Sequence, residues 1–278
     1  MGQKKTPSLG RVLLWTYGFS FGLFGLYLLL GGRLDSPGFV LFALLYMWVP
    51  GLVALRFASQ EGLRLPLALR PNRYWLFAWL FPVGLTLLSI PLSLPFGRWQ
   101  GLKGLQEAIP NLQPLPEPLL WSLLLQGLLA GATVNLLAAL GEELMWRGYL
   151  WEKLKAQGFW PASLEIGLYW GFWHAPLILM GYNYPQHPLL GAGMMTLFSI
   201  LLTPALLYVR EKGGSILGAA LLHGTLNAVA GLSVLAVERT NDLLVGVLGL
   251  PGLFLLAAFN LYLRRRGLCG ILQLREAE

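Results

Sequence analysis

The sequence predicts an all-α polytopic integral membrane protein, and three observations lead to that fold class. Apolar residues make up 56% of the 278 residues, whereas only 12% are charged. That charged fraction is about half of what a soluble domain usually carries. The apolar residues also form runs of about 20, the length that an α-helix needs to cross a bilayer. We therefore expect one membrane domain over residues 1–278, with about eight transmembrane helices and any functional site inside the bundle.

Eight apolar runs follow one another along the chain, and each is expected to form one helix. Several runs contain proline, for example Pro50, Pro82 and Pro204. Membrane helices tolerate such residues because neighbouring helices satisfy the freed backbone groups. Residues 97–117, between the third and fourth runs, could form a short interfacial helix or a plain loop. The runs are 12–32, 37–55, 74–96, 118–141, 159–181, 190–209, 213–237 and 242–263.

The distribution of Lys and Arg predicts the orientation of these helices. If the N-terminus is cytoplasmic and the sides alternate, 16 basic residues lie on the inside. The outside loops then hold four, namely Arg33, Arg98, Lys103 and Arg239. Cytoplasmic loops of membrane proteins are enriched in Lys and Arg, so we expect both termini to be cytoplasmic.

The net charge of +7 does not indicate nucleic-acid binding, because the basic residues lie between the apolar runs where they set orientation. The expected surroundings of the chain are membrane lipid. The single cysteine, Cys269, excludes an intramolecular disulfide and any metal site built from several cysteines.

Charged side chains in or beside membrane spans are costly, so each is a candidate functional residue. Where the fourth run continues, Glu143 and Arg147 are four residues apart and share one helix face. Glu142 points about 100° away and is left outside that pair. A carboxylate in apolar surroundings is suited to act as a general base. The alternative is that both glutamates belong to a solvated helix end.

Two further groups are histidines inside predicted spans. His174 lies deep in the fifth run among aromatic residues, where a helix-to-helix hydrogen bond is the alternative to a catalytic role. His223 and Asn227 are four residues apart in the seventh run and project from one face. They could equally form a buried polar clasp. Together with Glu142, these side chains make a hydrolytic set, in which a base deprotonates water and donors stabilise an oxyanion.

The same set could instead hold a divalent metal such as zinc. Glu142, His174 and His223 would be three ligands, with water in the open position. The sequence has no H-E-x-x-H motif, so the usual geometry of soluble zinc proteases is absent. We expect a site that works without a bound metal, because the residues flanking the two histidines offer no side chain to support them as ligands.

At these residues the chain resembles the CPBP family of intramembrane proteases, which includes CAAX-processing endoproteases and Abi-type proteins. The family pattern is E-E-x-x-x-R, then F-x-x-x-H, then H-x-x-x-N or H-x-x-x-D, and the matching motifs lie within residues 140–230. Trp170 replaces the usual Phe, an exchange expected to alter packing rather than chemistry. The chain reads Glu142-Glu143-x-x-x-Arg147, Trp170-x-x-x-His174 and His223-x-x-x-Asn227.

The resemblance implies hydrolysis of a peptide bond in a membrane-associated protein or peptide, which can be prenylated. It implies that Glu142 activates water beside His174 and that His223 and Asn227 hold the oxyanion. It also suggests a plasma membrane of bacterial type. We expect the site to open toward the cytoplasm, because the fourth run reaches Glu142 at its inner end. Two alternatives stay open: a non-catalytic immunity or scaffold protein, and a proton-coupled transporter that uses Glu142 and the histidines as a relay. Against transport, the sequence contains no paired inverted halves.

Overall fold

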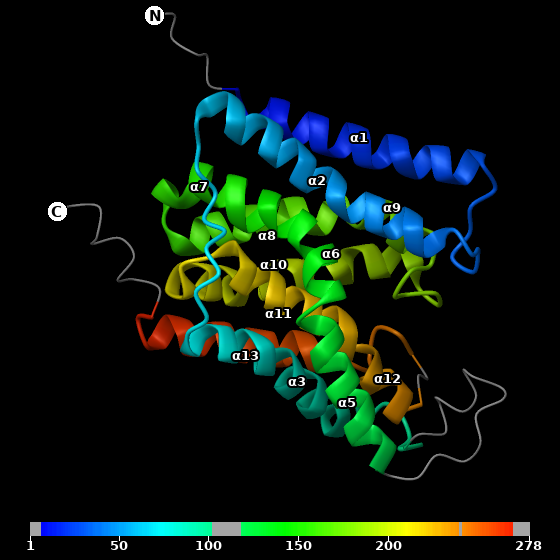
Figure 1. Cartoon of the computed structure of the whole chain (residues 1–278). Coiled ribbons are helices and arrows are strands. Elements are labelled where there is room, and N and C mark those ends of the chain that lie inside the picture. Colours follow the sequence, from blue (N-terminus) through cyan, green and yellow to red (C-terminus); the bar gives the residue numbers. More distant parts are fainter. Residues whose placement is uncertain (1–6, 102–117, 239–240, 269–278) are drawn as a thin grey trace, which may run out of the picture.

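The computed structural model describes residues 7–101, 118–238 and 241–268, and these residues form a helical bundle (Figure 1). Within them there is no strand, and the one β-bridge joins Trp99 to Val237. The all-α prediction is therefore confirmed. The helices are α1 Leu9–Leu29, α2 Phe39–Glu61, α3 Arg73–Ser93, α5 Pro118–Gly131, α6 Val134–Glu143, η1 Leu144–Tyr149, α7 Leu150–Leu154, η2 Lys155–Gln157, α8 Phe159–Trp173, α9 Ala175–Leu179, α10 Pro188–Gly213, α11 Ile216–Val229, α12 Gly231–Ala236 and α13 Leu250–Arg265.

Each of the eight apolar runs contains helix, but the predicted count of eight spans is not confirmed. Five helices of the described chain are long and apolar enough to cross a membrane, and a bent pair raises the number to six. The helices α8 and α13 have only 15 and 16 residues. The segment 97–117, for which an interfacial helix and a plain loop were both open, lies largely outside the described residues. Cys269 also lies outside them.

The fourth run differs most from its prediction. Its helix bends by 47° between Gly131 and Val134, and it then continues to Gln157 instead of ending near residue 141. Hydropathy failed here because Glu142, Glu143 and Arg147 lower the apolar average, although all three side chains are buried. Glu142 thus lies 15 residues before the end of this helix, or about 22 Å at the usual rise.

This shift places Glu142 and His174 at matching depths. His174 directly follows the 15 residues of α8, so it also lies about 22 Å from the end at which α8 begins. The predicted span boundaries would have put Glu142 near the inner surface and His174 much deeper. The longer helix removes that disagreement, because both side chains now lie in the middle of the bundle.

Small residues allow the central helices to touch. A methyl group at Gly224 of α11 would lie 2.6 Å from the backbone of Asn135 in α6, and one at Gly171 of α8 would lie 2.5 Å from Thr196 in α10. Only glycine permits such backbone contact. The helices α6, α8, α10 and α11 therefore form the centre of the bundle, while many side chains on its outside are large and apolar, for example Leu14, Leu29 and Phe254.

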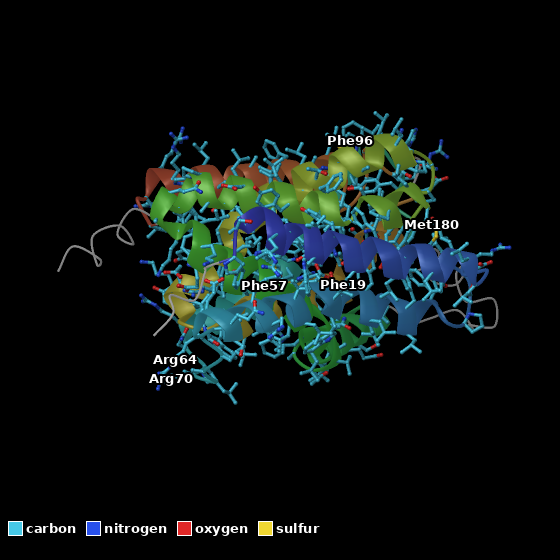
Figure 2. All side chains as sticks on the ribbon, turned by 90° about the horizontal axis from the view of Figure 1, so that it is seen from above. Phe19, Phe57, Arg64, Arg70, Phe96 and Met180 are labelled. Carbon is cyan, nitrogen blue, oxygen red and sulfur yellow. The ribbon has the colours of Figure 1, made fainter. Side chains whose placement is uncertain are left out.

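One end of the bundle is rich in charged groups. Figure 2 shows Arg64 and Arg70 at this end and Met180 at the other. The first described helix begins, and the last one ends, on the side of the charged groups (Figure 1). Glu61 accepts hydrogen bonds from Tyr149 and Lys153, and Glu152 pairs with Arg210. We refer to these residues, with Trp151, Lys155 and Glu211, as the basic-end network.

Candidate active site

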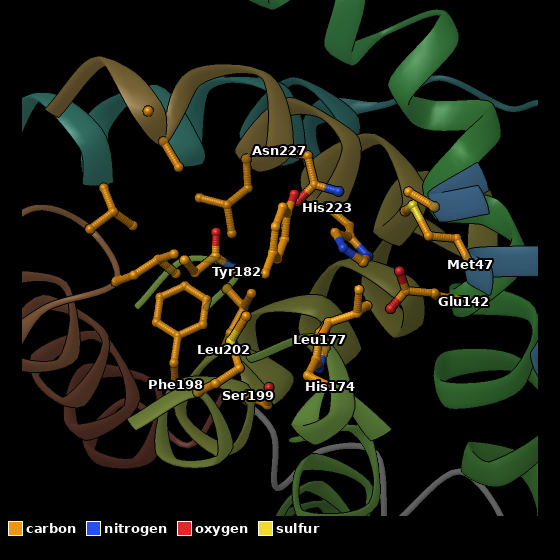
Figure 3. Close-up of a pocket in the computed structure, with 18 of the residues that line it drawn as sticks. Met47, Glu142, His174, Leu177, Tyr182, Phe198, Ser199, Leu202, His223 and Asn227 are labelled. Atoms are coloured by element: carbon orange, nitrogen blue, oxygen red, sulfur yellow. The ribbon is translucent and has the colours of Figure 1, made fainter. Parts of the chain in front are cut away.

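A cavity of about 520 Å³ lies inside the bundle and brings together all four predicted catalytic residues. Glu142 comes from α6, His174 from the break between α8 and α9, and His223 and Asn227 from α11. Figure 3 shows these side chains around the same space. Residues separated by more than 80 positions in the sequence thus converge, as a hydrolytic set requires.

The Glu143–Arg147 pair forms as the four-residue spacing predicts. Arg147 Nη1 donates to Glu143 Oε1 at 2.9 Å, and both side chains are fully buried. The pair persists although residues 144–149 form a π-helix, a wide turn that often occurs at functional sites. The second Arg147 nitrogen, Nη2, donates to Thr203 on α10 at 2.9 Å, so the cation also ties α10 to the site.

Glu143 also orients His223. The Nδ1 atom of His223 lies 2.8 Å from Glu143 Oε1. Because a carboxylate accepts, Nδ1 carries the hydrogen, and Nε2 of His223 is left for other partners. The buried glutamate that the sequence assigned to Arg147 therefore holds the tautomer of His223 as well.

His174 is held in the same tautomer by a different partner. It follows the last residue of α8, and its Nδ1 donates to the backbone carbonyl of Trp170 at 2.8 Å. The side chain is half-buried and lines the cavity. Its Nε2 is consequently available as a hydrogen-bond acceptor.

Asn227 lies one turn after His223 on α11, as predicted, and its side chain is exposed to the cavity. Figure 3 shows the two side chains on the same side of the space, opposite His174. The amide therefore can donate to a group that enters the cavity.

Trp170 does more than the predicted packing. Its indole Nε1 donates to Glu142 Oε2 at 2.7 Å, which is a contact that phenylalanine cannot make. Its ring also lies under the Arg147 guanidinium, with the Cζ atom 4.0 Å from the ring centroid. The prediction that Glu142 has no partner is wrong in this respect, because the tryptophan on the neighbouring helix supplies one.

Two features of Glu142, His174 and His223 bear on whether these residues could hold a metal ion. The Nδ1 atoms of both histidines have hydrogen-bond partners, the Glu143 carboxylate and the backbone carbonyl of Trp170. These partners come from another helix and from the backbone, and not from the flanking side chains to which the expectation referred. Yet among the described residues no three His, Cys, Asp or Glu side chains are grouped so that they could hold a metal ion. Glu142, His174 and His223 line the same cavity without forming a ligand set.

The cavity also exposes polar residues that the sequence analysis missed. Asn135 lies seven residues before Glu142, which is two helical turns, so its position on the same face was a usable signal. Tyr182 comes from the loop after α9, where no sequence pattern marks it. Removal from bulk water and the Glu142 carboxylate raise the pKa of Tyr182, so its hydroxyl stays protonated as a donor.

The cavity extends away from the end at which we expected it to open. Its wall includes Phe39 and Val40 at the start of α2, Tyr182, and Val245 in the segment before α13. Tyr182 follows Met180 by two residues, and Figure 2 shows Met180 at the end opposite Arg64 and Arg70. The helix α2 also begins at the end where α1 finishes, away from the charged end (Figure 1). At the other end, η1 and α7 continue the helix of Glu142, and Arg147, Tyr149 and Leu150 are all fully buried.

Fold and site together define a polytopic membrane protein with a polar, partly unpaired site enclosed in its bundle. Residues 112–229 match the family described as Type II CAAX prenyl endopeptidase Rce1-like. A curated relative, CAAX prenyl protease 2 of Methanococcus maripaludis, is 35% identical over 103 residues. That alignment covers 35% of this chain and 32% of the relative. These matches confirm the predicted resemblance to the CAAX protease family, and the matched segment contains every residue of the three motifs.

Proposed function

We propose that this chain is an intramembrane endopeptidase that hydrolyses a peptide bond of a membrane-associated protein or peptide. One observation carries the proposal. A carboxylate, two histidine rings and an amide from three parts of the bundle line a single cavity, namely Glu142, His174, His223 and Asn227. A buried polar clasp would account for Glu143, Arg147 and His223, which bond to one another. It would not account for polar groups that face open space.

In the proposed reaction Glu142 is the general base. Its carboxylate removes a proton from a water molecule, and the Nε2 atom of His174 accepts a hydrogen bond from the same water. The water oxygen then attacks the carbonyl carbon of the substrate and forms a tetrahedral intermediate. Glu142 returns the proton to the amide nitrogen as the C–N bond breaks, so the base is regenerated.

His223 and Asn227 are the proposed donors to the oxyanion. The Asn227 amide can donate directly, whereas His223 can donate from Nε2 only when both ring nitrogens carry hydrogen, because Nδ1 is bonded to Glu143. In that state Arg147 and the imidazolium contribute two positive charges, and Glu142 and Glu143 contribute two negative charges. The buried set is then neutral, as a set of charges removed from water must nearly be.

The relative's name describes a protease of prenylated CAAX proteins. For this chain we propose a protein or peptide substrate that can carry a prenyl group and that approaches from the surrounding lipid. We also propose that the chain lies in a plasma membrane of bacterial type with both termini cytoplasmic, on the strength of its Lys and Arg distribution. No metal takes part in the proposed steps.

The proposal is tested by proteolysis with the purified protein in detergent. The assay uses a quenched fluorescent peptide in prenylated and unprenylated forms, with and without a strong chelator. Loss of a general base typically costs 10²- to 10⁴-fold in rate, so we expect a loss of about that size for Glu142→Gln. The matched control is Glu165→Gln on α8, whose carboxylate binds Tyr169 and does not line the cavity.

Full activity of Glu142→Gln would refute the proposed base. Activity that vanishes in chelator and returns with stoichiometric zinc would replace the metal-free reaction with one in which Glu142, His174 and His223 hold Zn²⁺.

A further inference from the structure

Trp170 contacts four other residues of the site, namely Glu142, Arg147, His174 and His223. Its indole nitrogen bonds to Glu142, its backbone carbonyl accepts from His174, and its ring faces the Arg147 guanidinium. The ring centroid also lies 5.3 Å from that of His223. The side chain is only 3% exposed, so these contacts are made without competition from bulk water.

The two halves of this side chain act on two charges of opposite sign. The indole edge presents its N–H to the Glu142 carboxylate at 2.7 Å, while the negative face of the ring lies 4.0 Å from Arg147. Arg147 meanwhile donates to Glu143 and Thr203 and not to Glu142. Arg147 is thus held beside Glu143, and Glu142 receives a neutral donor instead.

The kind of partner, cationic or neutral, affects how well the Glu142 carboxylate accepts a proton. A carboxylate paired with arginine has its charge neutralised and is a weak proton acceptor, whereas a hydrogen bond from a neutral indole leaves the full negative charge in place. Within the described part of the chain, the indole N–H is the sole hydrogen bond to Glu142. The other carboxylate oxygen, Oε1, is left for the water molecule.

We infer that Trp170 is a positioning residue, which fixes the Glu142 carboxylate through its indole N–H and keeps Arg147 on Glu143 through its ring. The inference rests on the proposed function of Glu142. It reverses the expectation that tryptophan in place of the family's phenylalanine changes packing alone. It also predicts that the N–H acts on the rate of the chemical step and not on substrate binding.

The test replaces Trp170 with phenylalanine, the residue of the family pattern, which keeps an aromatic face for Arg147 and removes the N–H. Hydrogen bonds to charged groups are worth about 1.5–3 kcal/mol, which corresponds to about 10- to 100-fold in rate. We expect kcat for the fluorescent peptide to fall by about that factor while KM stays within about threefold, because the hydrogen bond to the base is lost.

The matched control is Trp151→Phe. The Trp151 indole donates to the carboxylate of Glu211 at 2.6 Å and is also 3% exposed, but it belongs to the basic-end network and does not line the cavity. It therefore loses the same kind of bond at equal burial, and we expect it to keep the wild-type kcat. An equal fall in kcat for both variants would overturn the inference.

A second variant covers the case in which Trp170→Phe does not fold. Genetic incorporation of 3-benzothienylalanine at position 170 puts sulfur in place of the N–H and preserves the shape of the ring. A wild-type kcat in either folded variant would refute the positioning role. The two single variants separate the two proposals. An active Glu142→Gln protein contradicts the proposed function, whereas an inactive Glu142→Gln protein beside a fully active Trp170 variant contradicts only the inference. We expect the double variant, Trp170→Phe with Glu142→Gln, to be no slower than Glu142→Gln alone.

Discussion

The basic-end network and the cavity both contain buried or half-buried charges, but these charges differ in the number of their hydrogen-bond partners. In the basic-end network each carboxylate has two donors: Glu61 binds Tyr149 and Lys153, and Glu211 binds Trp151 and Arg210. In the cavity Glu142 has one neutral donor and an open oxygen, and Asn227 faces the space without a bond from the described residues. Paired charges hold helices together, whereas unpaired ones in an enclosed space are available for chemistry.

Glu143 and Arg147 belong to the first kind although they lie beside the second. They are fully buried, and their ion pair is extended by His223 and Thr203. The motif Glu142-Glu143-x-x-x-Arg147 thus joins a stabilising pair to a candidate base in adjacent residues. Removing charges of each kind, and measuring stability and rate separately, tests whether the two regions differ in this way.

The largest effect is expected for Arg147→Ala. Removing one partner of a buried ion pair leaves the other charge unpaired, which costs about 3–5 kcal/mol of folding free energy. Thermal unfolding in detergent should therefore show Arg147→Ala and Glu143→Ala to be far less stable than the wild type, while Glu142→Ala stays close to it. If Glu142→Ala were the least stable of the three, the assignment of base and pair would be the wrong way round.

A smaller effect, on rate alone, is expected for Asn227→Ala. Loss of one oxyanion donor typically costs about 10²- to 10³-fold in kcat, and the Asn227 side chain is exposed in the cavity, so stability should change little. The kcat of the variant is compared with that of Thr133→Ala, whose hydroxyl bonds to Leu129 on the outside of the bundle. A wild-type kcat in Asn227→Ala would contradict the proposed role of Asn227 as an oxyanion donor.

The smallest effect is expected for Lys153→Ala in the basic-end network. The Lys153 side chain is 25% exposed, and Glu61 keeps Tyr149 as a second donor. Partly exposed ion pairs contribute about 0–1 kcal/mol. Both the unfolding temperature and kcat should therefore stay near those of the wild type. A loss of stability as large as that of Arg147→Ala would show that the two regions do not differ in the way described.

Prediction from the sequence succeeded where a property belongs to one helix. Each apolar run contains helix, and the four-residue spacing paired Glu143 with Arg147 and put His223 and Asn227 on one face. It failed at the fourth run, where an average over hydropathy ended the helix near residue 141. Such an average treats Glu143 and Arg147 as separate charges, although their attraction and the hydrogen bonds to His223 and Thr203 offset part of the cost of burying them.

Helical periodicity and apolar length are local properties, so they were enough to predict the class of protein, the candidate site residues and the pairing within each helix. How the helices are rotated and shifted against one another depends instead on packing between distant segments. That arrangement bonds Trp170 to Glu142, joins Glu143 to His223 across two helices, and brings Asn135 and Tyr182 to the cavity. Contacts between helices depend on side chains far apart in the chain, and no spacing within one segment specifies them.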